Sequence, residues 1–294
     1  MKISRKTFIA RSLLTLIGLK FAPKLFATNH NPKVVLQKRV LGNTGIEVTT
    51  LGFGTPRTQE ESVLKAALDD GMTFLDTGRG YANGQNEVMI GKVLKGIREK
   101  YVIQSKMKIR IQNKTSSADI REQMEKSLNE SLKALQTDYI DVMLLHGVRD
   151  AEVIQNETIR EVFTEMKTQG LIRACGFSAH TNHVELLRES NKDHFFYVIM
   201  VPFNPFGAFK HSQSGWSTSW DQETLIKEMK IAHQNGTGIV AMKTCSGGPY
   251  AFQKQTEPNF SGAVQWVLSH DFVDTTAVAM ANFQQIKEHC SGFK

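Results

Sequence analysis

A strand-like run near the middle of the chain reads Tyr139-Ile140-Asp141-Val142-Met143-Leu144-Leu145-His146. An amphipathic segment at 158–169 predicts a helix after it, and Ile172-Arg173-Ala174-Cys175-Gly176-Phe177-Ser178 predicts the next strand. A strand, a helix and a strand in this order predict two parallel strands covered by the helix that joins them.

The same unit recurs on both sides of this stretch. Further strands are predicted at 48–54, 72–76, 101–106, 197–202, 238–243 and 275–279. Helices are predicted between them, at 59–70, 87–98, 120–135, 182–189, 222–234, 263–269 and 284–289. Eight such units in about 250 residues predict an α/β fold of the (β/α)8 TIM barrel type. An open doubly wound sheet is disfavoured because no Gly-x-Gly-x-x-Gly motif follows a strand. Residues 207–219 are expected to form a long loop over the barrel mouth.

The composition excludes several classes of protein. Of 294 residues, 40% are hydrophobic and 22% are charged, so the chain can bury a sizeable core and is not disordered, collagen-like or a coiled coil. The formal net charge is +7, but six cations lie in the first 27 residues, which hold no acid, and the remainder carries only +1. Nucleic-acid binding is therefore not expected. The widely spaced Cys175, Cys245 and Cys290 predict neither a disulfide framework nor a metal site.

The first 27 residues have the form of a secretory signal peptide. Ser4-Arg5-Lys6-Thr7-Phe8-Ile9 precedes a short apolar run, and Ala27 is a small residue suited to cleavage. The segment resembles a twin-arginine export signal in which Lys6 stands in the place of the second arginine. We expect a protein exported to the bacterial periplasm, with a polar linker at 28–35 and the barrel at 36–294. An uncleaved N-terminal anchor is the alternative, and it would be the expected membrane contact.

Four polar residues fall at or just after the predicted carboxyl ends of consecutive strands, where the reactive groups of a barrel lie. They are Asp76, Tyr81, Lys106 and His146. Each has an ordinary explanation when taken alone: a helix cap, a packing aromatic, a solvated cation and a core imidazole. Together, at the ends of three consecutive strands, they predict one catalytic site.

Several longer stretches accompany these residues. They are Leu41-Gly42-Asn43-Thr44-Gly45-Ile46-Glu47-Val48, Leu51-Gly52-Phe53-Gly54-Thr55, Phe74-Leu75-Asp76-Thr77-Gly78-Arg79-Gly80-Tyr81, Asn86-Glu87-Val88-Met89-Ile90-Gly91, Ser105-Lys106, the run 138–146 and Gly176-Phe177-Ser178. In these stretches the chain resembles an aldo-keto reductase over nearly all of residues 36–289. The resemblance implies a TIM barrel with a short N-terminal β-hairpin. It also implies an NAD(P)H-dependent oxidoreductase that converts an aldehyde or ketone to an alcohol, with a small-molecule substrate as its partner.

By this resemblance Asp76, Tyr81, Lys106 and His146 form the catalytic tetrad. Reducing a carbonyl requires a hydride from a nicotinamide and a proton for the developing alkoxide, which Tyr81 is expected to give. A phenol holds its proton until about pH 10, so Lys106 is expected to ease proton exchange, with Asp76 holding and balancing the ammonium. His146 is expected to bond and orient the substrate oxygen.

The resemblance also implies which residues contact the cofactor, NADP or NAD. They are Gly54, Thr55, Ser178, Met200, Asn204, Met242, Ser246, Gly247, Gly248 and Gln285. Ser178 stands where relatives have a Ser-Asn pair, Met200 where they have a Gln, and Met242 where an aromatic ring stacks on the nicotinamide. The amides of 246–248 are expected to cradle the pyrophosphate. Gln285 replaces the arginine that grips the 2′-phosphate, which leaves the choice between NADH and NADPH open. No iron–sulfur cluster is expected, because the cysteine-rich tail of some relatives does not follow.

Two other functions remain open at this point. A catalytically weak barrel that binds nicotinamide and acts through protein partners would explain the missing cofactor contacts. A lyase or isomerase would use Lys106 and His146 without nicotinamide. Two smaller features have ordinary interpretations: His180-x-x-His183 is a helix start rather than a metal pair, and Cys245 is a small buried filler rather than a reactive thiol. The substrate and the oligomeric state cannot be read from the sequence.

Overall fold

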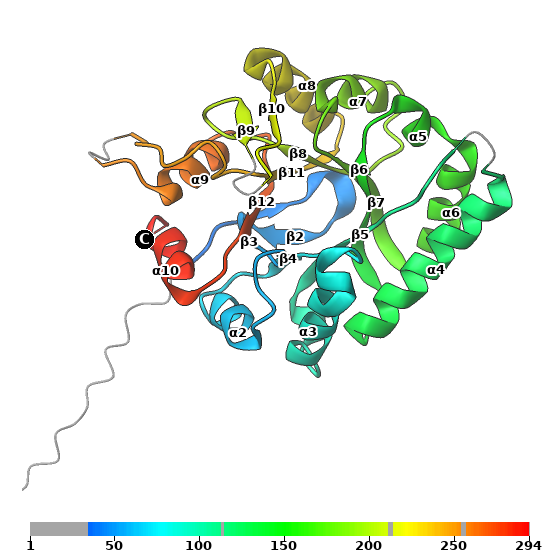
Figure 1. The fold of residues 1–294 in the computed structure, drawn as a ribbon, viewed down its shortest axis with the longest axis horizontal. Coiled ribbons are helices and arrows are strands. Elements are labelled where there is room, and N and C mark those ends of the chain that lie inside the picture. The colour runs from blue at the N-terminus through cyan, green and yellow to red at the C-terminus, as the bar shows by residue number, and fades with distance from the viewer. Residues whose placement is uncertain (1–34, 113–114, 211–213, 254–256, 294) are drawn as a thin grey trace, which may run out of the picture. The chain divides into compact units, whose positions relative to one another are not determined.

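In a computed structural model, residues 35–112, 115–210, 214–253 and 257–293 are described. Within these residues eight parallel strands close a barrel in the order β11-β12-β3-β4-β5-β6-β7-β8. Their bounds are β3 Leu51–Gly54, β4 Phe74–Asp76, β5 Val102–Met107, β6 Ile140–Val148, β7 Ile172–Ala179, β8 Val198–Pro202, β11 Gly238–Met242 and β12 Thr275–Ala279. Figure 1 looks along the barrel, with the strands at the centre and the helices around them. The predicted (β/α)8 barrel is confirmed.

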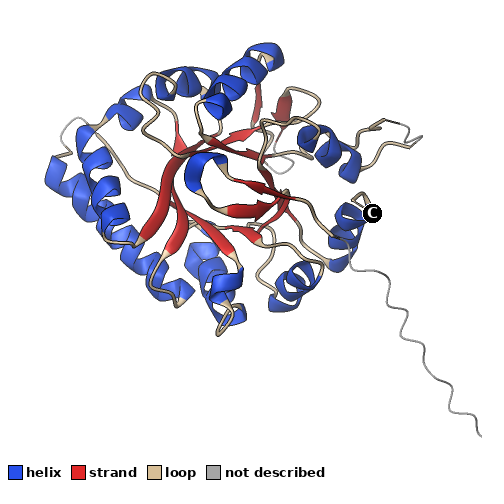
Figure 2. Cartoon of the chain, turned by 180° about the vertical axis from the view of Figure 1, so that it is seen from behind, coloured by secondary structure: helices blue, strands red, loops and turns tan. Residues whose placement is uncertain are grey.

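One helix follows most strands and covers the outside of the barrel, as Figure 2 shows from behind. The bounds are α2 Glu61–Asp69, α3 Gln85–Val93, α4 Ser117–Leu135, α5 Ala151–Gln155, α6 Glu157–Thr168, α7 His183–Ser190, α8 Gln222–Gln234, α9 Phe260–Leu268 and α10 Phe283–Ser291. Several begin at a polar residue that caps the first turn. Ser116 and Asp119 form a capping box at α4, and Asn156 and Asp221 cap α6 and α8.

The predicted N-terminal hairpin is present and closes the amino end of the barrel. β1 (Lys38–Val40) pairs with β2 (Glu47–Thr49), and a 3₁₀ turn at Gly42–Thr44 joins them. Its Leu41, Ile46 and Val48 are fully buried with the side chains inside the barrel. The carboxylate of Asp274 accepts from the amides of Gly42 and Ile239, which ties the turn to β11.

Alternate residues of each strand point to opposite sides, which separates two apolar clusters. Val102, Val142, Ala174, Val198 and Val240 belong to the cluster inside the barrel. Their odd-numbered neighbours, such as Ile103 and Met143, pack outward against the helices. Since Asp76, Lys106 and His146 share the even-numbered, inward set, their side chains are aimed into the barrel at its carboxyl end.

Three predicted elements differ from the structure. The strand expected at 48–54 is two strands, because Thr49 pairs with β1 while Thr50 bends the chain before β3. The helix expected at 87–98 ends at Val93. The loop expected at 207–219 contains a small hairpin of β9 (Ala208–Lys210) and β10 (Ser217–Ser219). The predicted signal peptide and residues 28–34 of the predicted linker lie outside the described residues. No helix in the described ranges is long and apolar enough to cross a membrane.

A buried ion cluster at the amino end of β6 is expected to contribute strongly to stability. The Asp141 carboxylate accepts from Arg98 at 2.7 Å, from Arg173 at 2.7 Å and from the amide of Ile103 at 2.9 Å. Its side chain is 1% exposed and that of Arg98 is 13% exposed. Asp141→Asn leaves the Arg98 charge uncompensated, so we expect the free energy of unfolding to fall by about 3 kcal/mol.

Urea unfolding measures this loss. The control is Glu47→Gln, which breaks the exposed pair with Lys38 and should leave stability unchanged. Equal midpoints for Asp141→Asn and Glu47→Gln would show that the buried cluster adds nothing.

Candidate active site

The structure brings the four predicted catalytic side chains together at the carboxyl end of the barrel. Asp76 ends β4, Lys106 lies near the end of β5, and His146 lies on β6. Tyr81 begins a 3₁₀ turn, Tyr81–Gly84, on the loop after β4. The ring centroids of Tyr81 and His146 lie 5.6 Å apart in an edge-to-face arrangement. The three strand-end side chains and the loop tyrosine therefore form one cluster.

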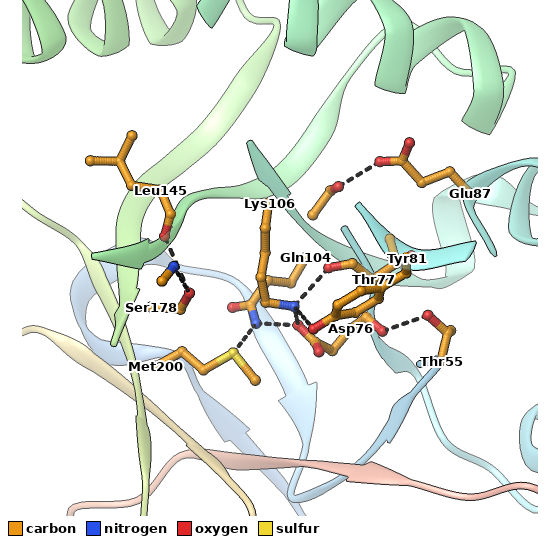
Figure 3. Close-up of polar contacts among 12 residues, drawn as sticks. Thr55, Asp76, Thr77, Tyr81, Glu87, Gln104, Lys106, Leu145, Ser178 and Met200 are labelled. Atoms are coloured by element: carbon orange, nitrogen blue, oxygen red, sulfur yellow. Dashed lines mark hydrogen bonds and ion pairs between the residues drawn. The ribbon is translucent and has the colours of Figure 1, made fainter. Parts of the chain in front are cut away.

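Lys106 is the centre of this cluster, and all three of its N–H groups have acceptors. Its Nζ lies 2.5 Å from Asp76 Oδ1, 2.7 Å from the carbonyl oxygen of Thr77 and 3.2 Å from Tyr81 Oη, as Figure 3 shows. Lys106 is 1% exposed and Asp76 is 2% exposed. Gln104, one inward position below Lys106, also donates to Asp76 Oδ1, at 2.7 Å. The ammonium is thus fixed in one place, with one donor directed at the phenol.

A second buried network holds the loop that carries Tyr81. Arg79 forms an ion pair with Glu87, whose side chain is fully buried, and Ser105 Oγ donates to the other oxygen of Glu87 at 2.6 Å. The amide of Arg79 donates to the carbonyl oxygen of Lys106 at 3.0 Å. The loop that carries Tyr81 and strand β5 are therefore joined through the side chain of Ser105 and through the backbone of Lys106. This fixes the position of the phenol relative to the ammonium.

The electrostatics suit a phenol that gives a proton. Burial raises the pKa of Tyr81, and Asp76 adds to this, while the charge of Lys106 opposes it without overcoming it. Burial alone lowers the pKa of Lys106, but Asp76 and Tyr81 outweigh burial and the net pKa is raised. The phenol therefore remains protonated and the lysine charged throughout the neutral range.

His146 is held in its neutral form. Burial lowers its pKa to about 4, and the positive charges of Lys106 and Lys108 add to this effect. A neutral imidazole keeps one N–H that can donate to a substrate oxygen while Tyr81 donates from beside it. Two donors therefore converge on the same side of the barrel mouth, as an oxyanion site requires.

Several residues predicted to bind the cofactor lie at neighbouring strand ends, but some are already engaged. Gly54 ends β3, and the hydroxyl of Thr55 donates to the carbonyl oxygen of Asp76 at 3.1 Å. Ser178 Oγ donates to the carbonyl oxygen of Leu145 at 3.2 Å and accepts from the amide of Gly147 at 3.0 Å. Met242 ends β11 with its side chain 7% exposed. Their contacts with a cofactor remain predictions.

Other predicted cofactor residues have structural partners. Met200 is 2% exposed and its sulfur accepts from Gln104 at 3.4 Å, below the ion pair (Figure 3). Both N–H groups of the Asn204 amide are used, on the carbonyl oxygens of Ala208 and Lys243. Gln285 Oε1 accepts from the amide of Ala281 at 2.7 Å at the start of α10. All three side chains form hydrogen bonds within the protein. Direct contact between them and a cofactor remains a prediction.

The turn after β11 was expected to offer backbone amides to a pyrophosphate. The amides of Ser246 and Gly248 donate to the carbonyl oxygens of Lys243 and Cys245, at 3.1 and 3.2 Å. Within the described part of the chain the amide of Gly247 has no such acceptor.

Burial raises the pKa of Cys245 to about 11, so this cysteine is a thiol at neutral pH. This agrees with the interpretation of Cys245 as a small side chain that fills space rather than a reactive thiol.

The donor set fits a nicotinamide cofactor at its reacting end. Tyr81 and His146 can donate a proton and bond an oxygen, but no side chain of the cluster can supply a hydride. A carbonyl reduction at this site therefore needs a hydride donor from outside the chain. Met242 and Gly54, at inward-facing strand ends, are the residues that would lie against it.

Three residues that the sequence analysis assigned to neither the catalytic nor the cofactor site also belong to this region. Gln104 supports Asp76, and its inward position follows from its spacing of two from Lys106. Lys243 directly follows β11, a position similar to that of Lys106 near the end of β5. The Nζ of Lys243 is buried. His180 lies next to His146, with ring centroids 6.3 Å apart.

Among the described residues no group of three or more His, Cys, Asp or Glu could hold a metal ion. Two surface hollows, one over α4 and one between α4 and α6, lie away from these residues.

Comparisons with known proteins bear on the family and the fold of this chain. The family model for the aldo/keto reductase family matches residues 47–262. An uncharacterized oxidoreductase of Bacillus subtilis, YqkF, is 32% identical over 185 residues, which cover 58% of this chain and 57% of that protein. The chain spans about half the length of the curated relatives it matches.

Solved structures share the whole barrel. An aldo-keto reductase from Bacillus halodurans, in its holo form, aligns with a TM-score of 0.70 and 26% identity, covering 88% of this chain and 91% of that one. An aldo-keto reductase from Klebsiella pneumoniae in complex with NADPH has the same fold, with a TM-score of 0.62 and 22% identity over 88% of this chain and 90% of that one. With the family model spanning most of the barrel, the chain belongs to the aldo/keto reductase family.

Proposed function

We propose that this protein is an NAD(P)H-dependent oxidoreductase that reduces an aldehyde or ketone to an alcohol. One observation carries the proposal: Tyr81 Oη lies 3.2 Å from the fully buried Nζ of Lys106, which is itself paired with Asp76. A charged lysine kept beside a protonated phenol is useful when that phenol must lose a proton during the reaction.

The residues have distinct tasks in this reaction. The phenol of Tyr81 gives its proton to the carbonyl oxygen as negative charge develops there, and His146 donates a hydrogen bond to the same oxygen. The phenolate that remains is stabilised by Lys106 until solvent returns a proton. Asp76 keeps the ammonium in place and balances its charge. When bound, a reduced nicotinamide supplies the hydride.

The choice between NADH and NADPH remains part of the proposal. The start of α10 offers Asn282 and Gln285, whose side chains are used in capping the helix, and neither carries a charge. A dianionic 2′-phosphate binds best where a guanidinium or ammonium is present. Acceptance of both cofactors, with NADH at least as effective as NADPH, is therefore proposed.

We further propose export of the protein to the periplasm. The support is the charged start, the apolar run and Ala27 in the first 27 residues.

A panel of aldehydes and ketones, tested with NADH and NADPH in single turnovers, decides between this function and the alternatives. We expect oxidation of the cofactor, followed at the nicotinamide absorbance, with at least one carbonyl compound. Saturable cofactor binding with no hydride transfer across the panel would instead support a nicotinamide-sensing barrel. Absence of saturable binding, read by fluorescence quenching, would support a lyase or isomerase.

A further inference from the structure

A buried cation that the proposed chemistry does not use lies at the mouth of the barrel. The Nζ of Lys243, directly after β11, is sealed from solvent and has no hydrogen-bond partner among the described residues. It lies 3.8 Å from the ring centroid of Phe209 and 4.6 Å from that of Trp216, on either side of the β9–β10 hairpin. Two aromatic faces offset only part of the free energy that a buried ammonium loses on leaving water.

In the described part of the chain no carboxylate forms an ion pair with this ammonium. Burial lowers the pKa of Lys243 to about 8, and no charged group opposes that change. Lys106, by contrast, is buried with Asp76 and has a raised pKa. The same residue type is paired at one strand end and unpaired at another, so an anion from outside the chain would stabilise the charged form of Lys243.

Two histidines that feel the charge of Lys243 have ring nitrogens without a hydrogen-bond partner among the described residues. His183 is 3% exposed, and neither of its ring nitrogens has a hydrogen-bond partner in the described structure; the same is true of Nδ1 of His180. Burial lowers the pKa of His180 to about 3 and that of His183 to about 4, and Lys243 contributes to both. Both rings are therefore neutral at neutral pH, and each carries an N–H able to donate to an anion.

This group is continuous with the reaction centre. The ring of His180 lies 6.3 Å from that of His146, which lies 5.6 Å from that of Tyr81. The charges that depress the pKa of His180 are Lys243, Lys106 and Arg149, and no acid counters them. The side of the mouth next to His146, where the substrate oxygen is expected, is thus positive and short of acceptors.

We infer that Lys243, His180 and His183 bind a carboxylate of the substrate, so that the reductase acts on oxo acids or aldehyde acids. The inference rests on the proposed function, because it assigns the substrate of the same site. A diphosphate of the cofactor is the other source of an anion, but the link through His180 to His146 favours the substrate. The carboxylate would supply the missing counterion of Lys243 and place the carbonyl beside His146.

The test compares carbonyl compounds that differ in one negative charge and one methyl group: para-carboxybenzaldehyde with its methyl ester, and phenylglyoxylate with its methyl ester. In Lys243→Met, we expect kcat/KM for the acids to fall about 10–100-fold, the loss of one charge-assisted buried contact, and that for the esters to stay within about twofold. Lys243→Arg should retain the preference for acids. Lys210→Met removes an exposed lysine of β9 and should leave kcat/KM unchanged for both the acids and the esters.

Two results would overturn the inference. Equal losses for acids and esters, with weaker binding of NADPH by Lys243→Met, would assign the ammonium to the cofactor. If Lys243→Met changed the melting temperature but not the kinetics, Lys243 would have only a structural role, packing against the rings of Phe209 and Trp216.

A binding experiment that needs no catalytic turnover tests the anion site separately from the proposed reductase function. Benzoate is titrated into the protein while the fluorescence of Trp216 and Trp220 is followed. Lys243-dependent, saturable quenching supports the anion site even if no carbonyl compound is reduced. Reduction of acids and esters alike, with no quenching, rejects the anion site and leaves the reductase function standing.

Discussion

Tyr81→Phe should lower kcat for carbonyl reduction by about 10²–10⁴-fold, the usual contribution of a positioned general acid. The variant keeps the ring, so the edge-to-face contact with His146 is retained, and it removes only the hydroxyl that lies 3.2 Å from Lys106. The remaining two acceptors of Lys106, Asp76 and the carbonyl oxygen of Thr77, keep the ammonium in place. The dissociation constant for the cofactor should therefore stay within about twofold.

Rapid-mixing single turnovers and a cofactor titration measure the two quantities separately. Tyr101→Phe is the matched control, because burial also raises the pKa of Tyr101 but this tyrosine precedes β5 at the opposite end of the barrel. It should leave turnover unchanged. If Tyr81→Phe turned over as fast as Tyr101→Phe, the proton would have to come from another group, and His146 would be the next candidate.

The convergence of three members of the tetrad could be predicted from the sequence because it depends on which strand positions carry them. Parallel strands of a barrel end at one rim, and a spacing of two along a strand keeps side chains on one face. Asp76 ends β4, and Lys106 and His146 lie at inward positions within two residues of the ends of β5 and β6, so their convergence follows from the strand bounds. The position of Tyr81 was less determined, since it depends on the buried Arg79–Glu87 pair that folds its loop back.

What the sequence could not give is the environment of each side chain. Ser178 and Asn204 have the chemistry of cofactor ligands, but backbone groups of β6, of β9 and of the turn after β11 occupy their hydrogen-bonding atoms in the structure. Lys243 is ordinary in the sequence and becomes unusual only because the β9–β10 hairpin, expected to be an irregular loop, brings Phe209 over it. The pKa of Tyr81 depends on this environment too, because burial raises it by more than the charge of Lys106 lowers it.

Lys106→Met should remove activity by at least about a hundredfold and also destabilise the protein. The phenolate formed at Tyr81 loses its stabilising charge, which affects the chemical step. The buried Asp76 is left with Gln104 as a side-chain partner, and a buried ion pair broken in this way typically costs about 3–5 kcal/mol. Loss of activity in this variant alone is therefore ambiguous, because misfolding would produce it too.

The double variant Lys106→Met with Asp76→Asn resolves the ambiguity. It removes both charges, and the asparagine oxygen can still accept from Gln104, so much of the lost stability should return. Activity should not return, since nothing then stabilises the phenolate. Urea midpoints and single-turnover rates are measured on both variants and on the parent protein. Should the double variant recover the rate together with the midpoint, the pair would be a structural element of the barrel, and the ammonium would have no part in moving the proton of Tyr81.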